Sequence, residues 1–183
     1  MNEKEKMLNG ELYLAEVPEL TQERTQCKML CWEYNNLAPI EIEKRKEIIK
    51  KLLGNTGKNF HIEQPFMCDY GYNIKIGENF YSNHNLIILD PNLVTFGDNV
   101  FIGPNCSFYT PLHPLDADTR NKYLEYAKPI KIGNNVWFGG NVTVLAGVTI
   151  GDNCVIGAGS VVTKDIPKNT LAFGNPARVI KTI

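Results

Sequence analysis

The sequence predicts a parallel β-helix, a coil of short strands stacked turn upon turn, with a small helical cap at one end and one protruding loop. Between residues 130 and 162, apolar-ended triplets recur every six residues, separated mostly by triplets of glycine, asparagine and aspartate. An α-helix cannot use this period, because six residues turn a side chain roughly 240° away from its starting face. In a strand, the first and third residues of each triplet share a face, which predicts a core of triplet ends.

Residues 1–58 are expected to form the helical cap. Thr21 is the expected N-cap of a first helix, whose apolar face ends at Tyr34, before a break between Asn35 and Pro39. A second helix is expected to begin near Pro39 and to end at Gly54. The apolar residues at helical spacing are Cys27, Leu30, Cys31, Tyr34, Ile42, Ile48, Ile49, Leu52 and Leu53.

The coil is expected over residues 59–165, with a C-terminal extension, residues 166–183, that covers its far end. Twelve triplets begin at residues 74, 80, 86, 94, 100, 106, 130, 136, 142, 148, 154 and 160. The six-residue step is interrupted twice, between 86 and 94 and between 106 and 130. If each turn has three sides, both insertions project from the same corner on adjacent turns. The longer one is a loop at about 109–129, and Trp137, Thr143 and Thr149 are predicted to point outward.

Composition indicates one domain with no charge bias toward a partner. The 183 residues include 20 acidic and 19 basic side chains, which gives no reason to expect nucleic acid or an anionic membrane as partner. The N-terminus is too charged for a secretory signal, and no apolar run approaches the length of a membrane span. A cytoplasmic protein is therefore expected.

Five cysteines, an odd and scattered set, are typical of buried thiols in a reducing compartment. Cys27 and Cys31 stand four residues apart on the expected first helix and could in principle hold a metal ion. No second pair of cysteines or histidines follows at ligand spacing, so core packing is the preferred interpretation and no metal site is predicted.

Several motifs together are specific for one family. They are Gly10-Glu11-Leu12-Tyr13, Cys68 to Ile74, Leu112-His113-Pro114-Leu115-Asp116, Ile132 to Trp137 and Gly174-Asn175-Pro176-Ala177-Arg178. This combination resembles the maltose and galactoside O-acetyltransferases, which are left-handed parallel β-helix acyltransferases of hexapeptide repeats. The resemblance implies transfer of an acetyl group from acetyl-CoA to a sugar hydroxyl. It also implies a homotrimer with active sites between subunits.

His113 is the candidate general base. Acetyl transfer to a hydroxyl needs a base with a near-neutral pKa, which histidine provides. On pattern alone, a histidine between Pro111 and Pro114 in a long loop is more often a solvated side chain, and its match to the family's His-Pro motif reverses that interpretation. His61 and His84 have no such match and are expected to be structural or exposed. No cysteine matches a catalytic position, so direct transfer is expected.

The resemblance also assigns substrate contacts. The acceptor sugar is expected at Asp69, Tyr81, Asn83 and Asp90. Where certain members present an aspartate to the sugar, this chain reads Leu14-Ala15-Glu16-Val17. Acetyl-CoA is expected at Trp137, Gly140, Ala158, Thr163, Lys164, Arg178 and Lys181. From Lys164 to Ile183 the chain carries four bases and one acid, a balance that favours CoA phosphates.

Three alternatives remain open from the sequence. The first is an acetyltransferase for another acceptor, such as an antibiotic or serine. The second is a metal-dependent hydratase, since some trimeric β-helices bind zinc through three histidines, although the three histidines here show no obvious pairing on adjacent turns. The third is a non-enzymatic solenoid that binds through its flat faces, which would leave the His113 loop unexplained.

Overall fold

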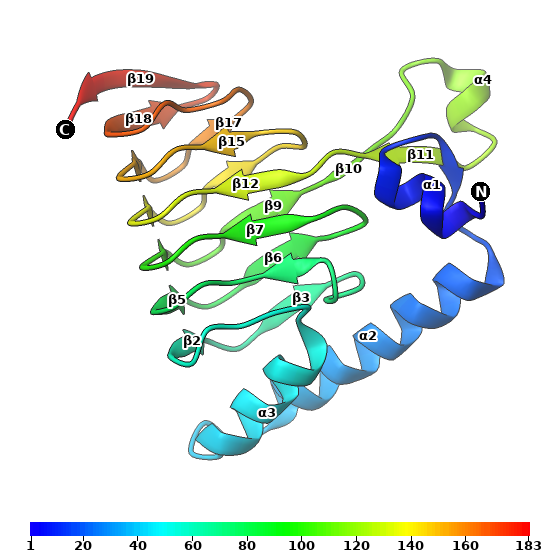
Figure 1. Cartoon of the computed structure of the whole chain (residues 1–183), viewed down its shortest axis with the longest axis horizontal. Helices are drawn as coiled ribbons and strands as arrows, with labels where there is room; N and C mark the ends of the chain where they lie inside the picture. The colour runs from blue at the N-terminus through cyan, green and yellow to red at the C-terminus, as the bar shows by residue number, and fades with distance from the viewer.

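A computed structural model, which describes residues 1–183, shows three parallel sheets wound into a coil (Figure 1). Sheet I contains β4 (Ile74–Lys75), β7 (Val94–Phe96), β12 (Ile130–Ile132) and β15 (Thr149–Ile150). Sheet II contains β2 (Phe60–Ile62), β5 (Phe80–Ser82), β8 (Phe101–Ile102), β13 (Trp137–Phe138), β16 (Val155–Ile156), β18 (Thr170–Gly174) and the antiparallel β19 (Ala177–Thr182). Sheet III contains β3 (Phe66–Cys68), β6 (Leu86–Leu89), β9 (Ser107–Tyr109), β14 (Thr143–Val144) and β17 (Val161–Val162). The predicted parallel β-helix is confirmed.

The strand register confirms eighteen residues per turn. Thr143 pairs with Val161, one regular turn later, whereas Val94 pairs with Ile130 because the long insertion lies between them. Both predicted insertions leave sheet III and return to sheet I, so they project from one corner on adjacent turns. A third insertion, residues 69–73, was missed. It occupies the same corner one turn earlier.

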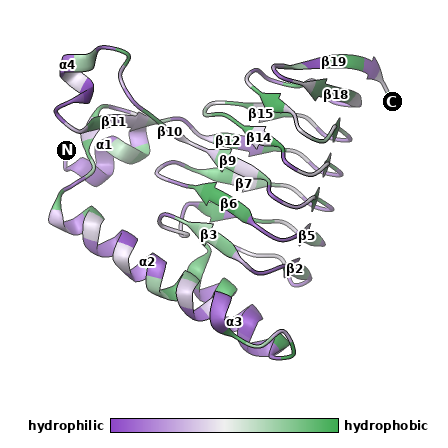
Figure 2. Ribbon diagram, turned by 180° about the vertical axis from the view of Figure 1, so that it is seen from behind, coloured by the Kyte–Doolittle hydropathy of each residue, from purple (hydrophilic) through white to green (hydrophobic).

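The core is a column formed by the first and third residues of the triplets. Both end residues of all twelve predicted triplets are buried. Inside the coil, Phe80, Phe96, Phe108 and Phe138 stack edge to face, with ring centroids 5.0 to 5.3 Å apart. Among the predicted outward residues, Trp137 and Thr149 are exposed and Thr143 is half-buried. The apolar strands and the more polar cap are visible in Figure 2.

The helical cap closes one end of the coil, but its boundaries differ from those predicted. The first long helix, α2 (Pro18–Asn36), begins three residues before Thr21, because Pro18 pre-sets the first turn and Val17 occupies the N-cap position. The next helix, α3 (Ile42–Leu52), begins after Pro39, which lies in a turn closed by a hydrogen bond from the Glu41 amide to the Ala38 carbonyl. Buried residues of both helices join the core of the coil.

A short N-terminal helix, α1 (Glu3–Asn9), was not predicted. Asn2 and Glu5 form a reciprocal capping box at its start, and Gly10 ends it in the left-handed conformation. Met7 on α1 packs in a small separate core with Leu20 and Tyr70.

The long insertion is more regular than a loop. It contains β10 (Pro111–Leu112), one helical turn, α4 (Ala117–Arg120), and β11 (Leu124–Ala127). β11 pairs antiparallel with both β10 and β1 (Tyr13–Leu14), so the N-terminal segment and the insertion form one three-stranded sheet beside the coil. None of the helices has the length and apolar character needed to cross a lipid bilayer.

Candidate active site

His113 follows β10 directly and lies across from β11. Its Nε2 atom is 3.9 Å from Oε2 of Glu125, within ion-pair distance but longer than a hydrogen bond. The Tyr13 hydroxyl donates to the other Glu125 oxygen. Tyr13 is fully buried, and burial followed by the Glu125 carboxylate raises the pKa of its phenol, which keeps the donor protonated. Tyr13 therefore fixes Glu125, and Glu125 faces the imidazole.

A pocket of about 270 Å³ opens in front of this imidazole. Its lining combines the N-terminal segment, α2, the insertion of residues 69–73, the turn after β6 and the β10–β11 hairpin. The residues are Ala15, Glu16, Arg24, Asp69, Tyr70, Leu89, Pro91, Pro111, His113 and Glu125. Carboxylates, a guanidinium and an imidazole around one opening can hydrogen-bond a polyhydroxylated ligand and remove a proton from it.

Arg24 connects the pocket wall to the coil. Its Nη1 atom donates to the Ala15 carbonyl at 2.9 Å and to the Tyr70 hydroxyl at 2.8 Å, and Nη2 lies 3.3 Å from Glu16. These contacts hold the N-terminal segment against the first turn of the coil. The carboxylate of Glu16, largely exposed, is thereby kept at the pocket.

Asp90 lies behind the pocket. Its side chain has no exposed surface, and its Oδ1 atom accepts hydrogen bonds from the amides of Asp69 (3.0 Å) and Tyr70 (2.9 Å). The turn that it supports packs tightly, because Gly71 has φ +77° and a Cβ there would lie 2.4 Å from the Leu52 carbonyl. Burial raises the pKa of Asp90 to about 7, and burial also raises the pKa of Asp69.

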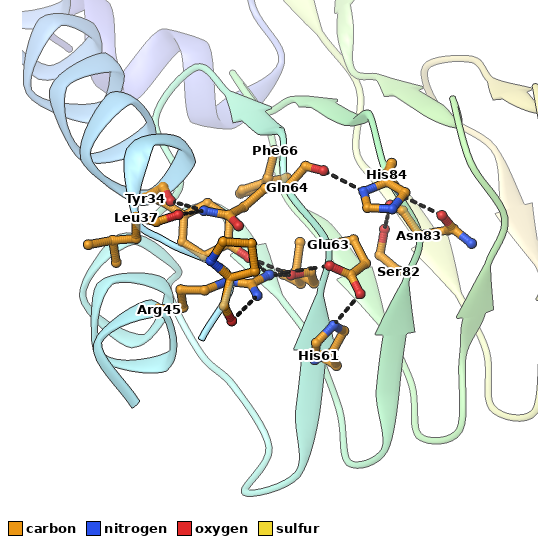
Figure 3. Close-up of polar contacts among 12 residues, drawn as sticks. Tyr34, Leu37, Arg45, His61, Glu63, Gln64, Phe66, Ser82, Asn83 and His84 are labelled. Atoms are coloured by element: carbon orange, nitrogen blue, oxygen red, sulfur yellow. Dashed lines mark hydrogen bonds and ion pairs between the residues drawn. The ribbon is translucent and has the colours of Figure 1, made fainter. Parts of the chain in front are cut away.

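Tyr81 and Asn83 do not line this pocket. Tyr81 lies on the outer face of sheet II, stacked on His61 with centroids 5.7 Å apart. Asn83 lies at the corner between sheets II and III, where its side-chain oxygen accepts from the His84 amide at 2.7 Å (Figure 3). Within one chain, neither residue lies at the corner that carries His113.

His61 and His84 have partners away from the pocket. His61 Nε2 lies 2.9 Å from Glu63, and His84 Nδ1 lies 2.5 Å from the Gln64 carbonyl (Figure 3). The three histidines form no cluster. The one group of three potential metal ligands is Cys27, Cys31 and Cys68.

The expected acetyl-CoA residues fall on several sides of the upper coil. Trp137, 57 % exposed, lies on sheet II, and Gly140 and Ala158 occupy the corner between sheets II and III on successive turns. Thr163 and Lys164 lie at the opposite edge of sheet III. Arg178 and Lys181 lie on β19, with Arg178 opposite Phe173 of β18.

Comparisons with known proteins agree with this architecture. A family model described as the maltose acetyltransferase hexapeptide capping motif matches residues 6–57, and a model of six bacterial transferase hexapeptide repeats matches residues 129–164. The galactoside O-acetyltransferase of Escherichia coli is 47 % identical over 98 % of this chain and 88 % of its own. The chain belongs to the maltose and galactoside O-acetyltransferase family.

Solved structures support the same assignment. A crystal structure of a maltose O-acetyltransferase from Clostridium difficile is 55 % identical, with a TM-score of 0.99 over all of this chain and 98 % of that one. A galactoside acetyltransferase in complex with coenzyme A is 46 % identical, with a TM-score of 0.96 over all of this chain and 91 % of that one. Membership in this family favours neither a hydratase nor a non-enzymatic solenoid.

Part of this pocket was predictable from the sequence. It identified His113 and Asp69, which the fold brings to one pocket, but it missed Tyr13, Glu16, Arg24 and Glu125. The Leu14 to Val17 segment was the available signal for Glu16, because the resemblance marks that segment as facing the sugar. Nothing in the sequence marks Glu125, since its position opposite His113 depends on the register of a hairpin.

Proposed function

We propose that this chain transfers an acetyl group from acetyl-CoA to a hydroxyl group of a sugar. The observation that carries the proposal is the His113 imidazole, which faces Glu125 at a pocket lined by Asp69, Glu16 and Arg24. The relatives support the chemistry, since two of them are named as sugar O-acetyltransferases and one was solved with coenzyme A.

His113 is the proposed general base. One imidazole nitrogen accepts the hydroxyl proton as the sugar oxygen attacks the thioester carbonyl, and the Glu125 carboxylate stabilises the imidazolium that forms. When the carbon–sulfur bond breaks, His113 returns that proton to the CoA thiolate, so the enzyme ends unchanged. None of the five cysteines lines the His113 pocket, which supports direct transfer without an acetyl-enzyme.

Asp69, Glu16 and Arg24 are the proposed acceptor-binding groups within one chain. Glu16 supplies a carboxylate in the segment where certain members present an aspartate. Asp90 was expected to contact the sugar, but its complete burial and its two backbone partners argue against that contact. We assign Asp90 instead to positioning the Asp69–Tyr70 turn.

A homotrimer with sites between subunits is the proposed assembly. In one chain Tyr81 lies on the face of sheet II and Asn83 at the corner between sheets II and III, both away from His113, so they can serve the same acceptor only from a neighbouring subunit. The exposed side chains of Phe101 and Trp137 form an apolar strip on sheet II that a neighbour or acetyl-CoA would cover. Gly140, Ala158, Thr163, Lys164, Arg178 and Lys181 are the remaining proposed acetyl-CoA contacts. All five cysteines are free thiols, which supports a cytoplasmic, reducing location for the protein.

An acceptor panel tests the function. Release of CoA thiol from acetyl-CoA is measured with maltose, glucose, a galactoside, serine and an aminoglycoside as acceptors. We expect saturable turnover with at least one sugar and only background hydrolysis with the other two compounds. Turnover confined to serine or the antibiotic would replace the sugar assignment with another acceptor of the same reaction.

A further inference from the structure

Three cysteines from two separate elements converge where α2 packs on β3. Cys27 and Cys31 lie one helical turn apart on α2 and both face Cys68 at the end of β3. The Cys68 Sγ atom lies 3.5 Å from that of Cys27 and 3.8 Å from that of Cys31, and all three sulfurs lie within 4.8 Å of one another. All three side chains are buried.

This spacing suits three thiolates bound to one ion. With a zinc–sulfur bond of about 2.3 Å, two sulfurs on the same ion lie about 3.8 Å apart in tetrahedral geometry and about 4.0 Å apart in trigonal geometry. The distances from Cys68 to the other two thiols fall close to these values. Soft thiolate donors without carboxylate or imidazole select thiophilic ions such as zinc.

The buried carboxyl of Asp90 lies near the thiols, since it accepts a hydrogen bond from the amide of Asp69, the residue after Cys68. Asp90 is fully buried, and its Oδ2 atom has no hydrogen-bond partner. A bound cation would offset the charges of the three thiolates that ligate it.

The cluster can be reached from the surface. Cys31 and Cys68 line a pocket of about 670 Å³, together with Trp32, Met67 and Asp69. An ion held by the three sulfurs would have its fourth position toward this pocket, where water can occupy it. Entry therefore requires no opening of the core.

We propose that Cys27, Cys31 and Cys68 form a binding site for one thiophilic metal ion of the zinc class. The ion ties α2 to β3, one residue before Asp69, and takes no part in acetyl transfer. Sequence spacing favoured core packing for Cys27 and Cys31. The third ligand lies 37 residues after Cys31 and reaches the pair only through the fold.

Cadmium titration of the reduced, chelator-treated full-length protein tests the site, because cadmium replaces zinc and its thiolate bonds absorb in the ultraviolet. We expect the charge-transfer band to saturate at one ion per chain, X-ray absorption to count three sulfur ligands, and added zinc to displace the cadmium. Cys31→Ser should weaken cadmium binding by at least about 100-fold, the upper range for lost outer-shell partners of metal sites. The double variant Cys106→Ala, Cys154→Ala removes two buried thiols outside the cluster and should bind as the wild type does.

The proposal is overturned if the wild-type protein shows no band, if fewer than three sulfurs surround the ion, or if zinc fails to displace cadmium. Equal binding by folded Cys31→Ser, checked by circular dichroism, also overturns it. The sulfur count on wild-type protein decides the matter even where the serine variant does not fold.

Discussion

At the scale of single residues, the placement of the His113 imidazole depends on groups distant in sequence. Glu125 faces it from the opposite strand of the hairpin, and Tyr13, from the N-terminal segment, holds Glu125 in place. A carboxylate facing a histidine orients the ring and stabilises its charged form. Glu125 is therefore a positioning residue for the proposed reaction.

Glu125→Gln is expected to lower kcat by about 10- to 100-fold, the range seen when a carboxylate that orients a histidine is lost. The KM for acetyl-CoA should stay within error, because Glu125 contacts only the pocket beside His113. Steady-state kinetics measure both, and Glu125→Asp should recover part of the lost kcat. Glu63→Gln is the matched control, since it removes a carboxylate that faces His61 outside the pocket. Equal losses in the two glutamine variants would contradict the assignment.

Asp90 should make stability depend on pH. Burial raises the pKa of Asp90 from its ordinary value of 3.8 to about 7 in the folded chain, and the nearby Asp69 carboxylate also raises it. The folded state then holds a proton that the unfolded state releases between about pH 4 and 7, so stability falls as pH rises through that window. Asp90→Asn keeps an oxygen acceptor but has no proton to release. The stability that the wild type loses between about pH 4 and 7, up to about 4 kcal/mol, should therefore not be lost in this variant. Denaturant unfolding at several pH values, with a chelator present, measures the free energy of unfolding of both proteins. If its pH dependence is the same in Asp90→Asn as in the wild type, the result argues against a buried carboxyl that titrates near 7.

The sequence identifies a residue where a local motif marks it and fails where tertiary contacts decide. His113 lies in a His-Pro motif, and Asp69 follows a coil triplet, so both were found. Asp90 was expected at the sugar because sequence gives no measure of its burial, which favours the positioning role proposed above. Arg24 was missed because a charged residue on an amphipathic helix is usually solvated, whereas here it donates to Ala15 and Tyr70.

At the scale of elements, asparagines at one corner of the coil hold successive turns together. Asn79, Asn99, Asn135, Asn153 and Asn169 all have φ between 55° and 58°. The side-chain amide of each of the first four donates to the next asparagine in the column, at 2.8 to 3.1 Å. Asparagine tolerates this left-handed conformation better than other residues with a side chain, and its amide adds a hydrogen-bonded ladder.

Substitutions at Asn135 separate the two contributions. Asn135→Gly removes the ladder contacts but accepts the positive φ, whereas Asn135→Ala removes the contacts and strains the backbone. The alanine variant should therefore lose about 1–2 kcal/mol more free energy of unfolding than the glycine variant. Denaturant unfolding at fixed protein concentration measures both, and equal losses would show that the conformation carries no cost at this corner.

Elements with a repeating pattern were predictable, and elements that depend on a distant partner were not. All twelve triplets became coil strands, because burial of both ends imposes the period. The segments β10 and β11 were expected only as a loop. Their strand structure depends on the pairing of β11 with β10 and with Tyr13 and Leu14, which the sequence pattern does not show. The helix α1 is too short for a clear apolar period and is marked only by its capping box.

At the scale of the whole molecule, the expected acceptor residues lie on two corners of the coil. Asp69 and His113 belong to the corner between sheets III and I, whereas Asn83 lies at the corner between sheets II and III. A single chain cannot bring both sets to one sugar without unwinding. A cyclic trimer can, because it places one corner of each chain against another corner of its neighbour.

Subunit mixing tests this arrangement. His113→Ala and Asn83→Ala chains, each expected to form weakly active trimers, are unfolded together and refolded at equal amounts. After random mixing, about one quarter of all interfaces in the refolded protein would combine an intact His113 with an intact Asn83 from the neighbour, as a head-to-tail interface requires. Thiol release should recover to about that share of the wild-type rate. Activity equal only to the mean of the two variants would place both residues in one chain's site.

The role of His113 as general base is tested by the turnover of His113→Ala with acetyl-CoA and its best sugar acceptor, alongside CoA binding by calorimetry. We expect kcat to fall by about 100-fold or more, the scale of a lost general base, with CoA affinity within twofold of the wild type. His84→Ala, which removes an imidazole bound to the Gln64 carbonyl outside the pocket, should keep the wild-type rate. Wild-type turnover in His113→Ala would contradict the central claim that this imidazole takes the proton from the acceptor.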